Sequence, residues 1–124
     1  MKVLTIKQPW ASLIVDNQKK YEFRSWKTNY RGKILIHAGL SMETKELNKL
    51  YNLEYIKGAI IGDAEIVDCI FVDDYIDEKL RNDNPVVYSN NHVGNYAWKL
   101  ENIKKYDKPI YVKGKLGLWN YEEN

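Results

Sequence analysis

The sequence predicts an α+β, mainly-β fold: a small β-barrel with short helices around it. Short stretches that alternate apolar and polar residues recur along the chain. Helix-like patterns are few and irregularly placed, which argues against alternating βαβ units. The longest strand-like stretch also loses its alternation midway, as a strand does where a bulge bends it into a barrel.

The first third of the chain predicts a strand, a short helix and a second strand. Residues 3–7 form the first strand, and Pro9 opens the helix because its fixed φ suits a first helical turn. Apolar residues follow at helical spacing over residues 10–15. Asn17 is expected to end the helix, since Asn tolerates the left-handed conformation. Residues 21–25 then alternate as a strand.

The middle of the chain predicts two strands and a helix. Residues 33–38 form a strand, and Ser41 is a good N-cap for a helix that carries Leu47, Leu50 and Tyr51. Residues 59–72 form the most β-like stretch. A bulge near Val67 would restore its alternation and bend the sheet.

The last third adds one helix and three short strands. Asp74 is expected to cap a helix that runs to about Arg81. The strands are predicted at residues 96–100, 110–113 and 118–121.

Length and composition indicate one domain over residues 1–124. No apolar stretch approaches the roughly 18 residues of a membrane span, and the N-terminus lacks the apolar core of a signal peptide. Cys69 is the sole cysteine, which excludes an internal disulfide and a cysteine metal cluster. We therefore expect a cytoplasmic monomer that needs no membrane and no cofactor.

Charge is unevenly distributed along the chain. Residues 1–37 hold eight Lys and Arg against two acids, residues 99–115 hold six against two, and residues 43–92 hold five against eleven. If the two ends meet in the fold, they form a basic face that attracts phosphate groups. Ordinary solubilising charge is the alternative explanation.

The densest group of ionisable residues follows the first helix. Lys19 lies at the helix end, and Glu22 and Arg24 share one face of the next strand. Charges that converge in this way are costly to desolvate unless they pair with each other or with a ligand. The three residues are thus either a binding site or a structural ion-pair group on the barrel rim.

Aromatic and histidine residues add fewer candidates. Trp26 follows the charged group beside Lys27 and Arg31, where a base could stack on it while the cations hold phosphate. Trp10 is expected to face the core. His37 on its strand is expected to be structural.

The remaining candidates are weaker. His92 lies in an Asn-rich loop and is expected to be exposed, while Cys69 is expected to be buried filler. Two distant histidines predict no metal site. Phosphate-loop and nucleophile-elbow motifs are missing from the sequence. Lys113 and Lys115 flank a glycine, which is a modest phosphate signal against the alternative of solvated surface.

Several motifs together resemble the ASCH domain, the activating signal cointegrator homology domain. They are Gln8-Pro9-Trp10, Lys19-x-x-Glu22-x-Arg24-Ser25-Trp26, Arg31-Gly32-x-Ile34-Leu35-Ile36-His37-Ala38, Gly58-Ala59-Ile60-Ile61-Gly62 and Lys113-Gly114-Lys115. Asn17 stands where the family signature has glycine. The resemblance implies a PUA-like fold with a cleft for RNA or a modified nucleoside beside the signature strand.

The resemblance implies an RNA-binding domain that acts in RNA metabolism or in transcription- or translation-linked regulation. Lysines and arginines would contact phosphates, Trp26 would stack on a base, and Glu22 and Arg24 would recognise base edges. The expected binding residues are Lys7, Gln8, Pro9, Trp10, Lys19, Glu22, Arg24, Ser25, Trp26, Lys27, Arg31, His37 and Lys113.

An enzyme is the alternative function. One branch of the family resembles small amidohydrolases that deacylate N4-acetylcytidine, and its signature lysine matches Lys19. That branch has a catalytic threonine where this chain has Glu22. Lys19 would act as base or nucleophile with its pKa lowered by burial or by Arg24, and Glu22 would orient it. A ligand-sensing or protein-interaction domain is a third possibility.

Overall fold

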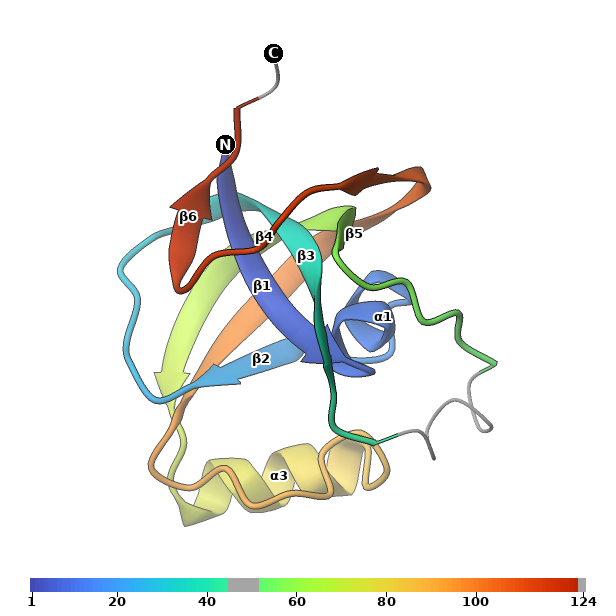
Figure 1. Ribbon diagram of the computed structural model, residues 1–124. Helices are drawn as coiled ribbons and strands as arrows, with labels where there is room; N and C mark the ends of the chain where they lie inside the picture. The colour runs from blue at the N-terminus through green and yellow to red at the C-terminus, as the bar shows by residue number, and fades with distance from the viewer. Residues whose placement is uncertain (45–51, 123–124) are drawn as a thin grey trace.

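The computed structural model describes residues 1–44 and 52–122. Within these residues, six strands and two helices follow one another (Figure 1). They are β1 (Lys2–Gln8), α1 (Trp10–Val15), β2 (Tyr21–Arg24), β3 (Gly32–Met42), β4 (Ala59–Phe71), α3 (Asp74–Asp83), β5 (Tyr96–Tyr111) and β6 (Leu118–Asn120).

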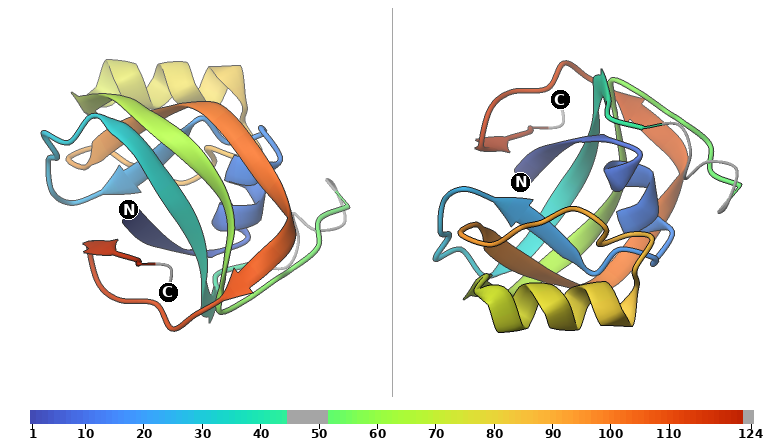
Figure 2. Two further views of the ribbon diagram at one scale, coloured as in Figure 1. Left: turned by 90° about the horizontal axis from the view of Figure 1, so that it is seen from above. Right: turned by 90° about the horizontal axis from the view of Figure 1, so that it is seen from below.

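All six strands belong to one sheet in the order β2-β5-β4-β3-β1-β6, and only β1 and β3 pair in parallel. The sheet is strongly curved and wraps part of the way around α1 (Figure 2). This arrangement confirms the α+β, PUA-like fold. The barrel is open, however, because the edge strands β2 and β6 are not paired with each other. The site lies in this opening, at the seam between β2 and the part of β1 that β6 does not cover.

The predicted bulge in β4 is confirmed. The register of β4 against β5 shifts between Ile66 and Asp68, which places the extra residue at Val67. Two further shifts lie between Ile60 and Gly62 and between Asp63 and Glu65. Each shift turns the strand locally, so one strand can follow the curve of the sheet.

β5 is one long strand where the sequence predicted two short ones. Repeated register shifts against β4 interrupt its alternation, which made its middle resemble a loop. Pro109 lies inside the strand, although proline lacks the N–H donor that a central strand needs. It is tolerated because β2 pairs only with residues 96–99, so the far part of β5 is a sheet edge.

Two other expectations need correction. Ser41 lies inside β3, which continues to pair with β1 as far as Met42, so it does not cap a helix. Leu47, Leu50 and Tyr51 lie outside the described residues. The helix α3 begins one residue away from the prediction: the side chain of Asp73 accepts from the Ile76 N–H, so Asp73 is the cap.

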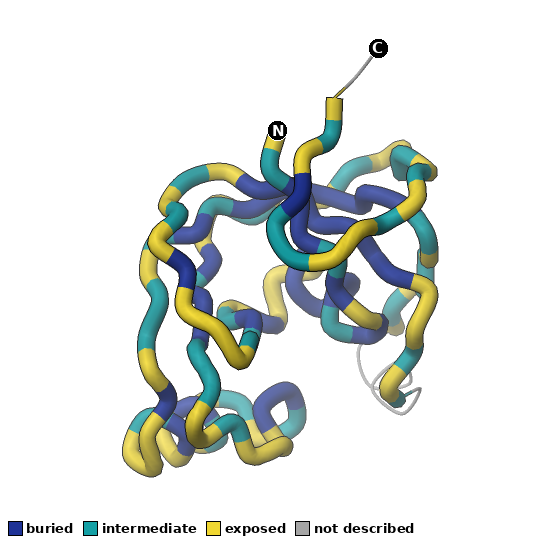
Figure 3. Tube along the Cα trace, turned by 60° about the vertical axis from the view of Figure 1, so that its left-hand side comes forward, coloured by how far each residue is buried: buried dark blue, intermediate teal, exposed yellow. Residues whose placement is uncertain are grey.

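The core lies between the curved sheet and α1, and buried stretches are concentrated in the central strands (Figure 3). Ile14 and Val15 from the helix pack there against residues such as Trp98. Cys69, predicted to be buried, is only half-buried at the edge of this core. A second cluster joins α3 to α1 through Leu13 and Leu80. No helix in the described part of the chain is long and apolar enough to cross a membrane.

Candidate functional site

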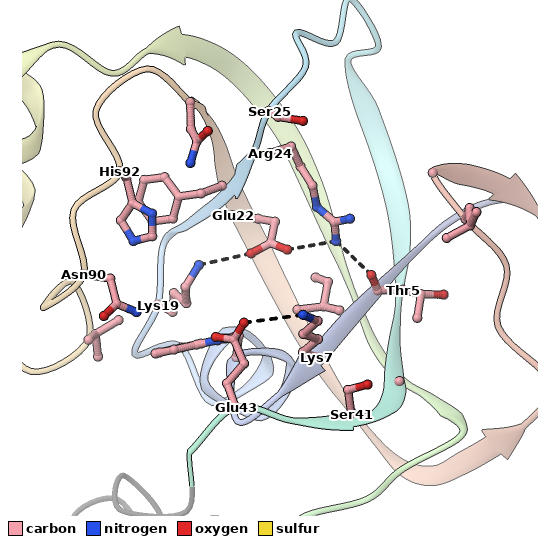
Figure 4. Close-up of a pocket in the computed structure, with 18 of the residues that line it drawn as sticks. Thr5, Lys7, Lys19, Glu22, Arg24, Ser25, Ser41, Glu43, Asn90 and His92 are labelled. Atoms are coloured by element: carbon pink, nitrogen blue, oxygen red, sulfur yellow. Dashed lines mark hydrogen bonds and ion pairs between the residues drawn. The ribbon is translucent and has the colours of Figure 1, made fainter.

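A cavity of about 560 Å³ opens at the seam between β1 and β2 (Figure 4). The end of β3, the loop after α3 and the turn before β6 complete its walls. Its lining residues are Thr5, Ile6, Lys7, Trp10, Lys19, Glu22, Phe23, Arg24, Ser25, Gly39, Ser41, Glu43, Val87, Asn90, His92, Asn95, Lys115, Leu116 and Gly117. Ligand pockets for small molecules and nucleotides typically have a volume of this order.

Lys19 reaches the cavity because of the way α1 ends. Asn17 has a left-handed φ of 65°, as the sequence predicted, and the Lys19 N–H donates to Leu13 O. The Lys19 residue is 3% exposed. Its Nζ donates to Tyr21 O and lies 3.2 Å from Glu22 Oε1. Burial lowers the pKa of Lys19, and the Glu22 carboxylate opposes that shift.

Glu22 bridges two cations. It shares a face of β2 with Arg24, and its Oε2 accepts from the Arg24 guanidinium at 2.9 Å. The same guanidinium nitrogen donates to Thr5 O on β1 at 2.8 Å and so spans the seam. The Arg24 Nε is buried and finds no acceptor among the described residues. The trio therefore forms the ion-pair group that one interpretation of the sequence predicted, and it also lines an open cavity, where a ligand could reach it.

The rim beside α1 is polar. Trp10, expected in the core, packs partly against it and also lines the cavity, where its Nε1 donates to Glu43 Oε2 at 2.6 Å. Lys7 lies 3.6 Å from the other Glu43 oxygen, and its side chain is 60% exposed. Lys7 therefore presents a solvent-exposed amine beside the cavity.

An aromatic pair forms the opposite wall. The rings of Phe23 and His92 stack with centroids 3.7 Å apart, and Lys19 Nζ lies 4.8 Å from the Phe23 centroid. The expectation that His92 is simply exposed is wrong, because its loop is tied down by a hydrogen bond from its N–H to Asp77. Burial, and then the charge of Lys19, lower the pKa of His92.

Cations outnumber acids around the cavity. Four lining side chains are cationic, Lys7, Lys19, Arg24 and Lys115, and two are acidic, Glu22 and Glu43. This imbalance favours an anionic ligand. Within the described ranges, no three His, Cys, Asp or Glu residues gather as metal ligands would.

The structure brings six of the predicted site residues to the cavity: Lys7, Trp10, Lys19, Glu22, Arg24 and Ser25. Gln8 lies beneath it, fully buried, and bonds Ser12 N–H and Ile56 O. Pro9 follows a cis peptide bond next to it. His37 is buried between Thr5 and Val112 O, as a structural histidine would be.

Four predicted residues lie away from the cavity lining. Trp26 is 39% exposed and packs edge-on against Trp98. Arg31 donates to Thr28 O and Tyr30 O, and Lys27 and Lys113 are not among the lining residues. Their proposed phosphate contacts and stacking remain predictions for RNA that extends beyond the cavity.

Sequence reasoning missed most of the cavity's loop residues. Phe23 stood inside the charged motif and Lys115 inside a noted glycine turn, so both carried a signal. His92, Asn90 and Glu43 carried none, because only the fold brings their loops to the seam.

Residues 4–110 match the ASCH domain family. The chain is a member of the ASCH family. It is 30% identical to human Activating signal cointegrator 1 and 29% identical to the mouse protein, in each case over 93% of this chain. The match spans only 24% of the length of these relatives.

Solved structures confirm the fold. The crystal structure of ASCH from Zymomonas mobilis superposes with a TM-score of 0.57 over 89% of this chain and 72% of that chain, at 19% identity. A mutant of the same Zymomonas mobilis protein gives a TM-score of 0.56 over 89% of this chain and 74% of that chain, also at 19% identity. Similarity at this level establishes the ASCH architecture of the chain.

Proposed function

We propose that this ASCH domain binds RNA and takes one nucleotide into the cavity at the seam. The observation that carries the proposal is the group formed by Lys19, Glu22 and Arg24, which is held at the wall of a cavity of about 560 Å³. Its cation surplus suits phosphate, and its aromatic wall suits a base.

The charge pattern outside the cavity supports a longer RNA contact. Lys7 and Lys115, one from each lysine-rich segment of the chain, line the same cavity. The exposed Lys7 amine is available to a phosphate of RNA that continues out of the cavity. RNA metabolism, or regulation linked to transcription or translation, is the setting we propose. A cytoplasmic location and a monomeric state also remain predictions.

Binding of labelled single-stranded RNA, followed by fluorescence anisotropy, tests the proposal. Affinity should fall by about tenfold or more between about 50 and 200 mM salt, because phosphate contacts release counterions. Arg24→Gln should weaken binding by about tenfold. Arg81→Gln is the matched control: Arg81 also pairs with a carboxylate, that of Asp77, but lies outside the cavity lining. Equal affinity in the two variants, or binding insensitive to salt, would contradict the proposal.

A second function is favoured by one observation. Lys19 is buried beside a carboxylate with its pKa lowered, which is the environment of a lysine base or nucleophile. We propose amide hydrolysis on acylated nucleosides as the alternative activity. The protein should then release acetate from N4-acetylcytidine, and Lys19→Ala should abolish the release. A wild-type protein that leaves a panel of acylated nucleosides and RNAs intact would remove this alternative.

A further inference from the structure

The cavity lies against the edges of two strands. Four consecutive residues of the β2 segment, 22–25, line it, and so do three consecutive residues of β1, 5–7. Side chains of consecutive strand residues point to opposite faces of a sheet. A cavity that touches every residue in turn must therefore contact the main chain along the strand edge.

In β2, the main-chain N–H and C=O of Phe23 face the cavity. The Leu100 N–H donates to Lys20 O, so these two residues form a hydrogen-bonded pair of the antiparallel ladder. Such pairs alternate along the ladder, so Glu22, opposite Trp98, also turns its main chain toward β5. The N–H and C=O of Phe23 then point to the free edge. Lys19 Nζ approaches Tyr21 O from this same free side.

The main chain of β1 presents Lys7 from the other side of the seam. Thr5 O accepts from Arg24 across the seam, and Gln8 O accepts from Glu43 on the side of β3. Main-chain groups of successive residues point to opposite sides of a strand. Lys7 lies two residues after Thr5 and one before Gln8, so its N–H and C=O turn toward the seam, as those of Thr5 do. β6 does not cover these groups, because it pairs only with residues 2–4. Outside the strand ladders, no hydrogen bond among the described residues reaches the main chain of Phe23 or Lys7.

We propose that the base in the cavity is recognised at its Watson–Crick edge by the main-chain N–H and C=O of Phe23, so that the ligand is a nucleotide of unpaired, single-stranded RNA. This inference rests on the function proposed above. An extended residue presents one donor beside one acceptor. Each nucleobase carries a donor next to an acceptor on its Watson–Crick edge, as uracil does with N3–H and O4. The contact accepts different bases but requires that the edge be free of a partner strand.

Substitutions at Phe23 separate its main chain from its ring. Phe23→Pro removes the N–H donor, and because this N–H faces the free edge, the ladder to β5 keeps its bonds. Phe23→Ala removes the ring and keeps the donor. With labelled single-stranded oligouridine, Phe23→Pro should bind about tenfold more weakly than Phe23→Ala. Equal affinity of two folded variants would overturn the inference.

A ligand-side experiment covers the case in which Phe23→Pro does not fold. Wild-type protein is titrated with oligouridine that carries either N3-methyluridine or 5-methyluridine at every position. The two methyl groups add the same bulk, but only the N3 group removes the donor on the Watson–Crick edge. We expect N3-methylation to weaken binding by about tenfold and 5-methylation to leave it unchanged. Equal binding of the two oligonucleotides would overturn the inference.

The same titrations keep the two proposals distinguishable. A wild-type protein that binds no single-stranded RNA contradicts RNA binding itself. Equal affinity for the N3-methylated and the 5-methylated oligouridine would contradict only the recognition of the base by the Phe23 main chain. A duplex of the same sequence should bind more weakly than the single strand, and a duplex that binds equally well would also count against an unpaired base.

Discussion

Two buried carboxylates, Glu22 at the seam and Asp63 on β4, have similar burial and different surroundings. Their residues are 7% and 6% exposed. Glu22 holds Lys19 and Arg24, whose side chains are 4% and 23% exposed and line the cavity. Asp63 accepts from the Tyr106 hydroxyl at 2.7 Å and lies 3.5 Å from Lys33, which is 55% exposed.

The difference lies in what surrounds each carboxylate. Asp63 is satisfied by a hydroxyl and a solvated amine and does not line the cavity. Burial and the bond to Asp63 raise the pKa of Tyr106, so its hydroxyl stays a donor. Glu22 instead keeps two desolvated cations at an open wall. Burial of a carboxylate alone does not indicate a site, whereas burial of its cations beside a cavity does.

The largest expected difference is in stability. Glu22→Gln should lower the free energy of unfolding by about 3 kcal/mol, because it leaves two largely buried cations without their carboxylate. Asp63→Asn should lower it by about 1 kcal/mol, since the amide oxygen still accepts from Tyr106 and Lys33 is solvated. Urea unfolding curves measure both values, and equal losses would show that the two clusters are equivalent.

The second-largest expected difference is in how much bound RNA stabilises variants of the Glu22 cluster and of the Asp63 cluster. Single-stranded RNA at about 100 times its Kd should stabilise the wild-type protein by roughly 2.7 kcal/mol. The Asp63→Asn variant should retain this gain. Lys19→Met should lose most of it, because the cavity loses a cation at the proposed base site. Thermal melts with and without RNA test this, and a full gain in Lys19→Met would exclude the seam as the binding site.

The pH dependence of stability should reflect Lys19. Its folded-state pKa lies below the ordinary value of 10.5, so between these two values the unfolded chain binds more protons than the folded one. The free energy of unfolding contributed by this residue therefore rises with pH through that window. Urea titrations at alkaline pH should show the rise in the wild-type protein and in Lys33→Met. Lys19→Met should lack it, and a rise retained there would assign it to another group.

The smallest expected effect is a shift in one histidine titration. Because burial and Lys19 both disfavour its charged form, His92 should titrate below pH 6.5. NMR of the His92 ring gives the midpoint directly, and Lys19→Met should move it upward. A midpoint at or above 6.5 would mean that the loop does not hold His92 against Phe23.

The sequence predicted the elements whose patterns are local. Asn17 at the helix end and the bulge at Val67 follow from side-chain preference and from broken alternation. The long β5 was not predictable, because its register shifts depend on the curvature of β4. The end of β3 was misjudged at Ser41, where a good helix cap is overridden by pairing with β1.

The sequence predicted the residues of the candidate site that are close together along the chain, but not those that the fold brings in from distant loops. Lys19, Glu22 and Arg24 are close in sequence, and motif spacing identified them. Glu43 and His92 come from distant loops, and nothing in their neighbourhoods indicates a site. The strand-edge main chain at Phe23 has no sequence signal, because every residue has the same N–H and C=O groups.

The short length of β6, three residues, leaves the cavity at the seam open. The register of Leu4 with Leu118 would next place Thr5 opposite Gly117 and Ile6 opposite Leu116. Gly117 has a φ of 63° and turns the chain away from this pairing, so Gly117 and Leu116, which is 97% exposed, line the cavity instead. A non-glycine residue at position 117 would disfavour that turn. If β6 paired with two more residues of β1, it would close the opening of the cavity. If β6 paired with fewer residues, the opening would be wider. For the proposed function, the length of β6 would thus set the size of ligand that the cavity admits, with the ionic motif left intact.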